Sequence, residues 1–182
     1  MILDGKRISE EVLQELKQRL NTLKNNKDRS PKLEIIFVGD DFASEKYVTM
    51  KQQKATDLGI EVNVNKFSDS STEKEIVELI ETLNQNNSVD GIMIQLPLPK
   101  HFNEEEIISH ISVKKDVDGL TAESLGKLFR KEECFVSATP KGIETLLDKY
   151  KIGIWGKNVV VVGRSKIVGL PISALMINRD AT

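Results

Sequence analysis

Short apolar runs that alternate with segments of helical periodicity constrain the fold of this chain more than any other feature. Residues 33–39 and 91–97 are nearly continuous apolar runs, as is typical of strands covered on both faces, and residues 60–67 alternate as a strand does. The segments around them repeat apolar residues at helical spacing, and Gly59 follows one of these segments where a C-terminal cap is favoured. This alternation predicts an α/β fold with parallel strands.

The same alternation continues through the second half of the chain. Thr72 and Glu75 stand in capping-box register at the start of one expected helix. Because the strand–helix pattern occurs over 33–95 and again from Asn158, we expect two α/β domains that meet near residues 134–142. The expected helices cover about 8–24, a segment ending at Leu58, 71–83, 103–111, 121–130, 139–150 and 170–178, and a fourth strand covers 158–163.

Composition excludes several classes of protein. The chain has 182 residues, of which 39% are apolar and 30% charged, so we expect a globular fold rather than disorder. The formal net charge of −2 does not favour binding to nucleic acid phosphates. No apolar run is long enough to span a membrane, and the first residues lack the apolar core of a secretory signal. Cys134 is the only cysteine, which is typical of a reducing compartment, so we expect a cytoplasmic protein.

Lys51 is the most informative charged residue in the helical segments. At helical spacing it falls within the stripe that Ser44, Val48 and Ala55 form, so its side chain is expected to face inward. A surface lysine whose stem packs on the protein is the common alternative, but an unpaired buried ammonium is costly, and this favours a functional role. Tyr47 lies one turn earlier, at the edge of the same stripe.

Two polar positions follow the third predicted strand. Gln95 ends that strand, and ligands of open parallel sheets bind beyond the carboxyl ends of the strands. A residue that only caps a turn is the alternative explanation for Gln95. The loop Lys115–Gly119 carries two carboxylates, Asp116 and Asp118, although Asp-Gly is also an ordinary turn sequence.

A glycine-spaced loop separates the last predicted strand from the last helix. Gly163, Ser165 and Gly169 permit close approach of backbone amides to an anion at a helix N-terminus, and Arg164 adds a cation that could pair with a phosphate. The spacing differs from the common G-x-G-x-x-G pattern, so the loop alone is weak evidence for a nucleotide site. The residue that usually reads the ribose lies about 20 positions further on, beyond Thr182, so NAD and NADP are not distinguished.

Five stretches occur together in an order that resembles one enzyme family. They read VGDDFASEKYVTMK, GIMIQLPLP, KDVDGLT, ATPKGI and VVVGRSKIVGLP, and together they extend over nearly all of the chain. Their order is similar to that in bifunctional methylenetetrahydrofolate dehydrogenase/methenyltetrahydrofolate cyclohydrolases. The resemblance implies oxidation of 5,10-methylenetetrahydrofolate to 5,10-methenyltetrahydrofolate with NADP, or with NAD, and hydrolysis of the product to 10-formyltetrahydrofolate. It also implies a homodimer that binds tetrahydrofolate derivatives.

The resemblance assigns roles to individual residues. It makes Lys51 the catalytic lysine, supported by Gln95, and it places Tyr47 along the folate ring and Asp118 on the pterin. All four are expected catalytic residues. The expected substrate-binding residues are Tyr47, Lys51, Ile94, Gln95, Leu96 and Asp118. The expected cofactor-binding residues are Gly163, Arg164 and Ser165. No metal is expected, and His101 and His110 are expected at the surface.

The resemblance also implies a domain organisation. Residues 1–138 would form a folate-binding catalytic domain with a parallel sheet, and residues 139–182 a hinge helix and the first part of a Rossmann-type dinucleotide-binding domain. Because that fold needs two βαβαβ halves, we expect a truncated member of the family that lacks on the order of 100 residues. Such a chain is expected neither to bind nor to reduce a dinucleotide by itself. Ser137-Ala138 replaces the usual Pro-Cys of the family, and Ser124 replaces a frequent asparagine.

Three alternatives compete with this interpretation. Tyr47-x-x-x-Lys51 matches the helix of short-chain dehydrogenases, but in those enzymes the glycine-rich loop precedes the tyrosine, whereas here Gly163 follows it. A shikimate-dehydrogenase-like enzyme also places a substrate domain with Lys and Asp before a Rossmann domain, but the QLPLP stretch is not expected there. The third alternative is an inactive fragment that folds without turnover.

Overall fold

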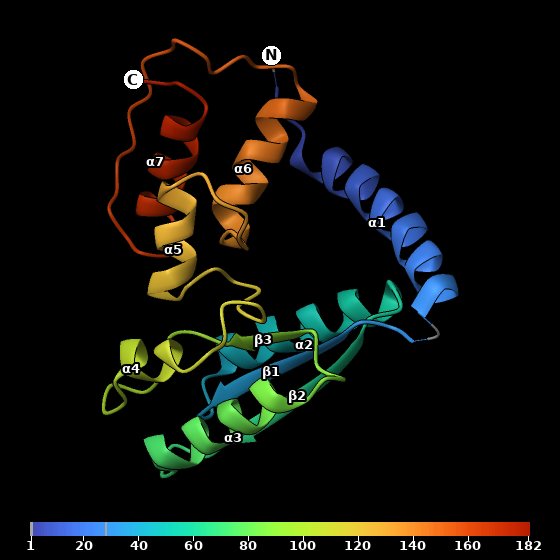
Figure 1. The fold of residues 1–182 in the computed structure, drawn as a ribbon, viewed down its shortest axis with the longest axis vertical. Coiled ribbons are helices and arrows are strands. Elements are labelled where there is room, and N and C mark those ends of the chain that lie inside the picture. Colours follow the sequence, from blue (N-terminus) through green and yellow to red (C-terminus); the bar gives the residue numbers. More distant parts are fainter. Residues whose placement is uncertain (1, 28) are drawn as a thin grey trace. The chain divides into compact units, whose positions relative to one another are not determined.

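The computed structural model describes residues 2–27 and 29–182, which divide into two compact units (Figure 1). One unit contains Val12–Lys115, and the other joins the residues up to Glu11 to Asp116–Thr182. The first helix, α1, covers Gly5–Lys27 and therefore contributes to both units. The domain division that we expect at residue 138 stays a prediction.

The Val12–Lys115 unit is built on a three-stranded parallel sheet in the order β2-β1-β3. β1 covers Lys32–Val38, β2 covers Glu61–Phe67 and β3 covers Gly91–Ile94. The central strand contributes the fully buried Ile35 and Ile36. The predicted parallel α/β arrangement is confirmed, because every connection between these strands contains a helix.

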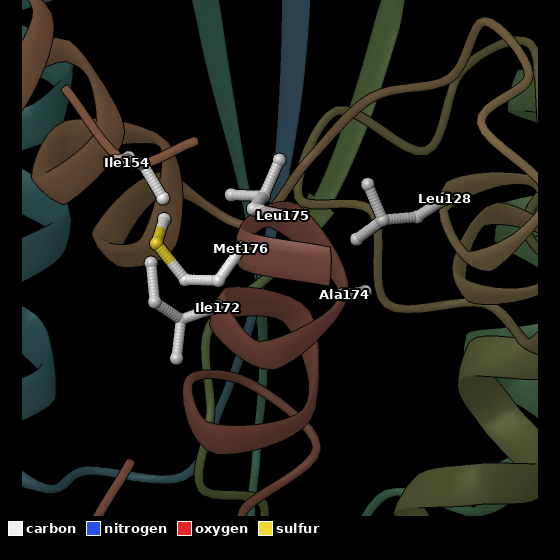
Figure 2. Packing of buried hydrophobic residues seen from close by; sticks show 6 residues of the cluster. All are labelled: Leu128, Ile154, Ile172, Ala174, Leu175 and Met176. Atoms are coloured by element: carbon white, nitrogen blue, oxygen red, sulfur yellow. The ribbon is translucent and has the colours of Figure 1, made fainter. Parts of the chain in front are cut away.

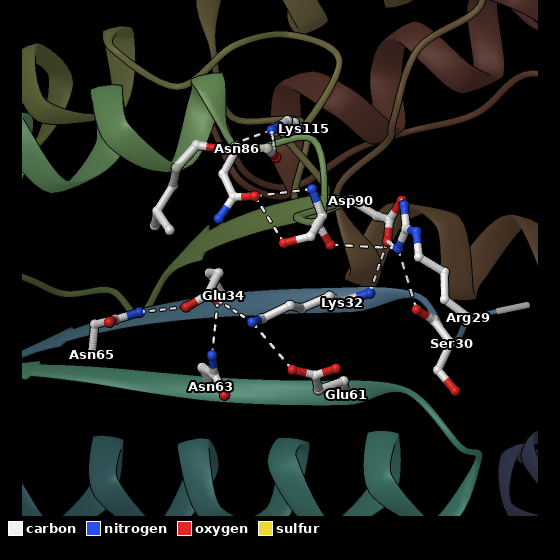
Figure 3. Close-up of polar contacts among 12 residues, drawn as sticks. Arg29, Ser30, Lys32, Glu34, Glu61, Asn63, Asn65, Asn86, Asp90 and Lys115 are labelled. Carbon is white, nitrogen blue, oxygen red and sulfur yellow. Dashed lines mark hydrogen bonds and ion pairs between the residues drawn. The ribbon is translucent and has the colours of Figure 1, made fainter.

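The predicted helix end at Leu58 and the predicted helix start after Thr72 are both confirmed. α2 covers Phe42–Asp57 and α3 covers Glu73–Gln85, and they cover opposite faces of the sheet (Figures 1 and 3). The capping box at α3 is present, since the Thr72 hydroxyl accepts from the Glu75 amide and the Glu75 carboxylate accepts from the Thr72 amide. The bonds that the Glu75 carboxylate accepts from the Thr72 amide and hydroxyl lower the pKa of Glu75. The short α4 covers Glu104–Ser109.

The other unit contains three further helices around its own apolar core. α5 covers Ala122–Phe129, α6 covers Ala138–Lys149 and α7 covers Gly169–Asn178. Figure 2 shows Ile172 and Met176 of α7 pointing toward Ile154, and Ala174 pointing toward Leu128 of α5. Most of this core comes from α5 and α7, and Ile154 joins it from the segment after α6.

The predicted strand at 158–163 is wrong. Backbone bonds join only the start of this segment to Thr182, from the Val159 amide to the Thr182 carbonyl at 2.8 Å and from the Thr182 amide to the Lys157 carbonyl at 2.9 Å. Val160 and Val162 are 86% and 98% exposed. A strand needs a partner along its length, and no strand within 2–27 and 29–182 lies beside residues 160–163, so the valines remain extended but unpaired.

A buried carboxylate lies on the central strand. Glu34 is 4% exposed and accepts hydrogen bonds from the side-chain amides of Asn63 at 3.0 Å and Asn65 at 2.8 Å, both on β2 (Figure 3). The Lys32 ammonium lies 3.6 Å from Glu34 and 3.1 Å from the exposed Glu61. Its hydrogen bond with Glu61 raises the pKa of Lys32. The two amide donors and the nearby ammonium compensate the burial of the Glu34 charge.

These contacts predict different costs for removing the two carboxylates that face Lys32. Glu34→Ala removes the acceptor that the exposed Asn63 and the half-buried Asn65 share, so we expect a loss of about 1–2 kcal/mol in the free energy of unfolding. Glu61→Ala removes an exposed partner of the same lysine and should cost less than about 0.5 kcal/mol. Urea denaturation of the three proteins measures both values. Equal costs would contradict a structural role for the Glu34 network.

Candidate functional site

Helix α2 is positioned by a cap that the sequence supplies. The Asp41 carboxylate accepts from the Ser44 amide at 2.7 Å, and this bond lowers the pKa of Asp41. At the other end, Gly59 has a φ of +87°, a left-handed conformation that glycine adopts without strain. Ser44 and Val48 are buried, which confirms the predicted inward stripe and fixes the rotation of the helix. This rotation directs Lys51 toward β3.

Lys51 and Gln95 form the central contact of the site. The Lys51 ammonium donates to Gln95 Oε1 at 3.1 Å and lies 3.6 Å from the sulfur of Met93. Gln95 Nε2 donates to the Leu96 carbonyl at 2.7 Å, which leaves Oε1 to face the lysine. The Gln95 amide donates to the Ile36 carbonyl at 2.8 Å, so the backbone of Gln95 continues the ladder beyond β3. The structure thus brings together the two residues predicted from different elements.

Lys51 faces the sheet, as predicted, but the residue as a whole is exposed. Its side chain extends toward the carboxyl end of β3, where the ammonium contacts Gln95 and remains accessible to solvent. Tyr47 is 58% exposed on the same helix. Two more predicted substrate-binding positions flank Gln95: Ile94 is buried and Leu96 is half-buried. The group therefore combines an accessible amine, an accessible phenol and an apolar border.

A cavity of about 350 Å³ opens at the carboxyl ends of the strands. It is lined by Val38, Gly39, Asp40, Asp41, Asp69, Pro97, Leu98 and Pro99. Asp40 and Asp69 were not predicted as site residues, although each follows the end of a strand and the carboxyl-end rule applies to both. Lys66 lies 3.0 Å from Asp40, and hydrogen bonding to Asp40 raises the pKa of Lys66.

Asp118 belongs to the other unit, where it lies in a tightly bonded turn. Asp118 is half-buried, between the buried Asp116 and Gly119. The Asp116 carboxylate accepts from the amides of Leu120 at 3.1 Å and Thr121 at 2.9 Å. The turn therefore has a defined shape that fixes the backbone of Asp118.

The predicted glycine loop folds compactly before α7. Gly163, Arg164 and Ser165 are exposed, and the Ser165 hydroxyl accepts from the amides of Val168 at 3.2 Å and Gly169 at 3.3 Å. A Cβ on Gly169 would lie 2.6 Å from the Gly163 carbonyl oxygen, so only glycine fits at the start of this helix. This close packing is what a glycine-rich nucleotide loop requires of its last glycine.

Membrane spans and metal clusters are both absent from residues 2–27 and 29–182. No helix in these ranges is long and apolar enough to cross a membrane. Within the same ranges, no cluster of three or more His, Cys, Asp or Glu side chains has the arrangement of a metal site. Ser137, one of the departures from the family pattern, precedes α6, is buried, and makes no side-chain bond to the helix.

Comparisons with known proteins place both parts of the chain in one family. Residues 3–118 match the family described as tetrahydrofolate dehydrogenase/cyclohydrolase, catalytic domain, and residues 137–182 match the NAD(P)-binding domain of the same family. The bifunctional protein FolD of Latilactobacillus sakei is 45% identical over 181 residues, which cover 100% of this chain and 64% of that protein. The chain thus spans less than two thirds of that relative's length.

Solved structures agree with this match. The bifunctional FolD enzyme of Campylobacter jejuni superposes with a TM-score of 0.97 at 39% identity, and the match covers 100% of this chain and 64% of that one. The Trypanosoma brucei methylenetetrahydrofolate dehydrogenase-cyclohydrolase, complexed with NADP cofactor and inhibitor, gives a TM-score of 0.93 at 30% identity, covering 100% and 62%. The fold class predicted from the sequence is confirmed by these neighbours.

The packing of the glycine loop predicts the effect of one added methyl group. Gly169→Ala should lower the free energy of unfolding by about 1–3 kcal/mol, because the methyl group would overlap the backbone of Gly163 and Arg164. Gly142→Ala in α6 is the matched control, since a Cβ there meets nothing within 4 Å. We expect it to raise stability by about 0.5–1 kcal/mol. Denaturation curves measure the free energy of unfolding of each variant. If both variants were more stable than the unmodified chain, the tight packing at Gly169 would be refuted.

Proposed function

The chain belongs to the tetrahydrofolate dehydrogenase/cyclohydrolase family, and on this premise we propose that it acts in the oxidation and hydrolysis of one-carbon tetrahydrofolates. The reactions are hydrolysis of 5,10-methenyltetrahydrofolate to 10-formyltetrahydrofolate, which needs no dinucleotide, and oxidation of 5,10-methylenetetrahydrofolate with NADP, which we propose for the protein with a complete dinucleotide-binding domain. The observation that carries the proposal is the 3.1 Å hydrogen bond between the Lys51 ammonium and Gln95 Oε1 at the carboxyl edge of the sheet. It holds an accessible amine at the edge where open parallel sheets bind ligands.

Lys51 is the proposed general base of the hydrolysis. Water must add to the methenyl carbon, which carries a delocalised positive charge, and a neighbouring amine is favoured in its neutral form by repulsion from that charge. The neutral amine takes a proton from the attacking water. Gln95 orients the amine without adding a charge, because its Oε1 accepts and its Nε2 is already engaged with Leu96.

Four further residues are proposed to bind the folate. The carboxylate of Asp118 accepts hydrogen bonds from adjacent N–H donors of the pterin. Tyr47 is exposed one helical turn before Lys51 and lies along the folate ring. Ile94 and Leu96 border the substrate on either side of Gln95.

The loop before α7 is the proposed place for the dinucleotide. Gly163, Arg164 and Ser165 would hold it, since Arg164 is an exposed cation and Gly169 lets the backbone pack closely behind the loop. NADP, which accepts a hydride when bound, is favoured over NAD because the Trypanosoma brucei relative forms a complex with NADP. We also propose a cytoplasmic homodimer, with a folate-binding domain at 1–138 and the dinucleotide-binding part at 139–182.

Lys51→Met tests the assignment of the base. The methionine keeps the length and apolar contacts of the side chain but removes the amine, so hydrolysis should fall by at least about 100-fold. The near-ultraviolet absorbance of methenyltetrahydrofolate follows this reaction, which needs no dinucleotide. Lys46→Met is the matched control on the exposed face of α2 and should retain full activity. If Lys51→Met hydrolyses methenyltetrahydrofolate as fast as the control does, Lys51 is not the base.

Asp118→Asn tests recognition of the pterin. The change keeps the size of the side chain but replaces one acceptor oxygen with a donor that would face a pterin donor. We expect binding of tetrahydrofolate to weaken by about 2–4 kcal/mol in calorimetry, on the scale of a lost charge-assisted hydrogen bond and a new mismatch. Asp148→Asn on α6 changes an exposed carboxylate in the same way and should leave binding intact. Unchanged affinity in Asp118→Asn would identify Asp118 as a plain turn residue.

A further inference from the structure

Asp116, two residues before Asp118, is more deeply buried than any other titratable residue of its unit. Its side chain is among the largest fully buried ones, at 1% exposure. Burying a carboxylate is costly unless donors surround it. The donors here all come from the following residues of the chain: the amides of Leu120 and Thr121, and the hydroxyl of Ser124 at 2.6 Å. The carboxylate therefore ties the turn to the start of α5.

The hydroxyl groups of Thr121 and Ser124 extend this network from the carboxylate into the first turn of α5. The Thr121 hydroxyl caps α5 by accepting from the Ser124 amide at 3.1 Å, and it lies 3.0 Å from the Ser124 hydroxyl. With this geometry Thr121 can donate to Ser124, which in turn donates to Asp116. The Ser124 side chain is thus buried and donates to the carboxylate of the turn.

The backbone of the turn is closed from the opposite side by Gly119. Its amide donates to the Asp116 carbonyl at 3.0 Å, and its φ is +61°, in the left-handed region. A Cβ at this position would lie 2.5 Å from the Phe135 carbonyl oxygen, so the turn packs directly on another backbone segment of the unit. Asp118 is therefore held between the buried carboxylate of Asp116 on one side and the packed Gly119 on the other.

We propose that Asp116 is a positioning residue for the pterin-binding carboxylate: its network sets the backbone of the turn so that Asp118 meets the pterin in one orientation. This inference rests on the proposed function, because it needs Asp118 to bind the pterin. Asp116 acts through Asp118 and touches no substrate. It therefore governs the binding of tetrahydrofolates and leaves the proton transfer at Lys51 unchanged.

Asp116→Asn is the direct variant, because it keeps the size of the side chain but turns one acceptor into a donor facing the donors of the network. We expect KM for methenyltetrahydrofolate to rise about tenfold or more, on the scale of a lost charge-assisted bond, with kcat retained within about twofold. A residue that only stabilised the fold would lower the active fraction, and so kcat, without moving KM. Asp148→Asn is the matched control and should change neither value.

A double-mutant cycle shows whether Asp116 acts through Asp118. In the Asp118→Asn background, Asp116→Asn should cost less than about twofold in tetrahydrofolate affinity, because the carboxylate that it positions is already gone. Ser124→Ala removes one of three donors and should give a smaller rise in KM than Asp116→Asn. Additive losses in the cycle, or an unchanged KM in Asp116→Asn, would overturn the proposal.

A third measurement separates this proposal from the proposed function. Hydrogen exchange of the Leu120 and Thr121 amides should accelerate at least about tenfold in Asp116→Asn while the amides of α7 stay protected. If the unmodified chain shows no binding or hydrolysis of tetrahydrofolates, the proposed function fails, and with it the pterin role of the turn. If the chain is active and the exchange of the two amides is unchanged, the positioning role of Asp116 alone is refuted.

Discussion

The parallel pairing of β1 with both of its neighbours is the constraint on which the candidate site depends. Because all three strands run in the same direction, their carboxyl ends meet at one edge, and the residues that follow them lie together although they are far apart in the sequence. Gln95 follows β3, Gly39 and Asp40 follow β1, and Asp69 lies in the loop after β2. An antiparallel partner on either side of β1 would have carried one of these groups to the opposite edge.

Lys51 reaches this edge only because α2 has a fixed rotation. The cap at Asp41 sets the first turn of the helix, and the burial of Ser44 and Val48 fixes which face meets the sheet. Two further contacts then limit the amine, one to Gln95 and one to the sulfur of Met93. The lysine is thus oriented by neutral atoms alone, and no carboxylate competes for its proton in the contacts that the described residues provide.

Sequence patterns predicted the elements that depend on local periodicity and failed where the outcome depends on a partner. The stripe through Ser44 and Val48 gave the correct face of α2, and Thr72 with Glu75 gave the start of α3. The exposure of Lys51 was missed because helical periodicity shows only on which face of the helix a side chain lies. It carries no information on how far the sheet extends beneath that face. The strand at 158–163 failed because its valines have the propensity for a strand but no neighbour to pair with. The pattern of two carboxylates in the loop at 115–119 was visible, but only the structure shows that Asp116 faces inward.

The loop before α7 carries its own acceptor for the amides that a phosphate would use. Ser165 Oγ already accepts from Val168 and Gly169, so an incoming phosphate at these amides would exchange one acceptor for another. The net gain in hydrogen bonding is then small, because the bonds to the phosphate replace similar bonds to Ser165. The attraction between the phosphate and Arg164 has no counterpart in the free loop, and salt weakens it. Association of any anion with this loop should therefore be governed by ionic strength far more than by the number of hydrogen bonds that the anion can accept.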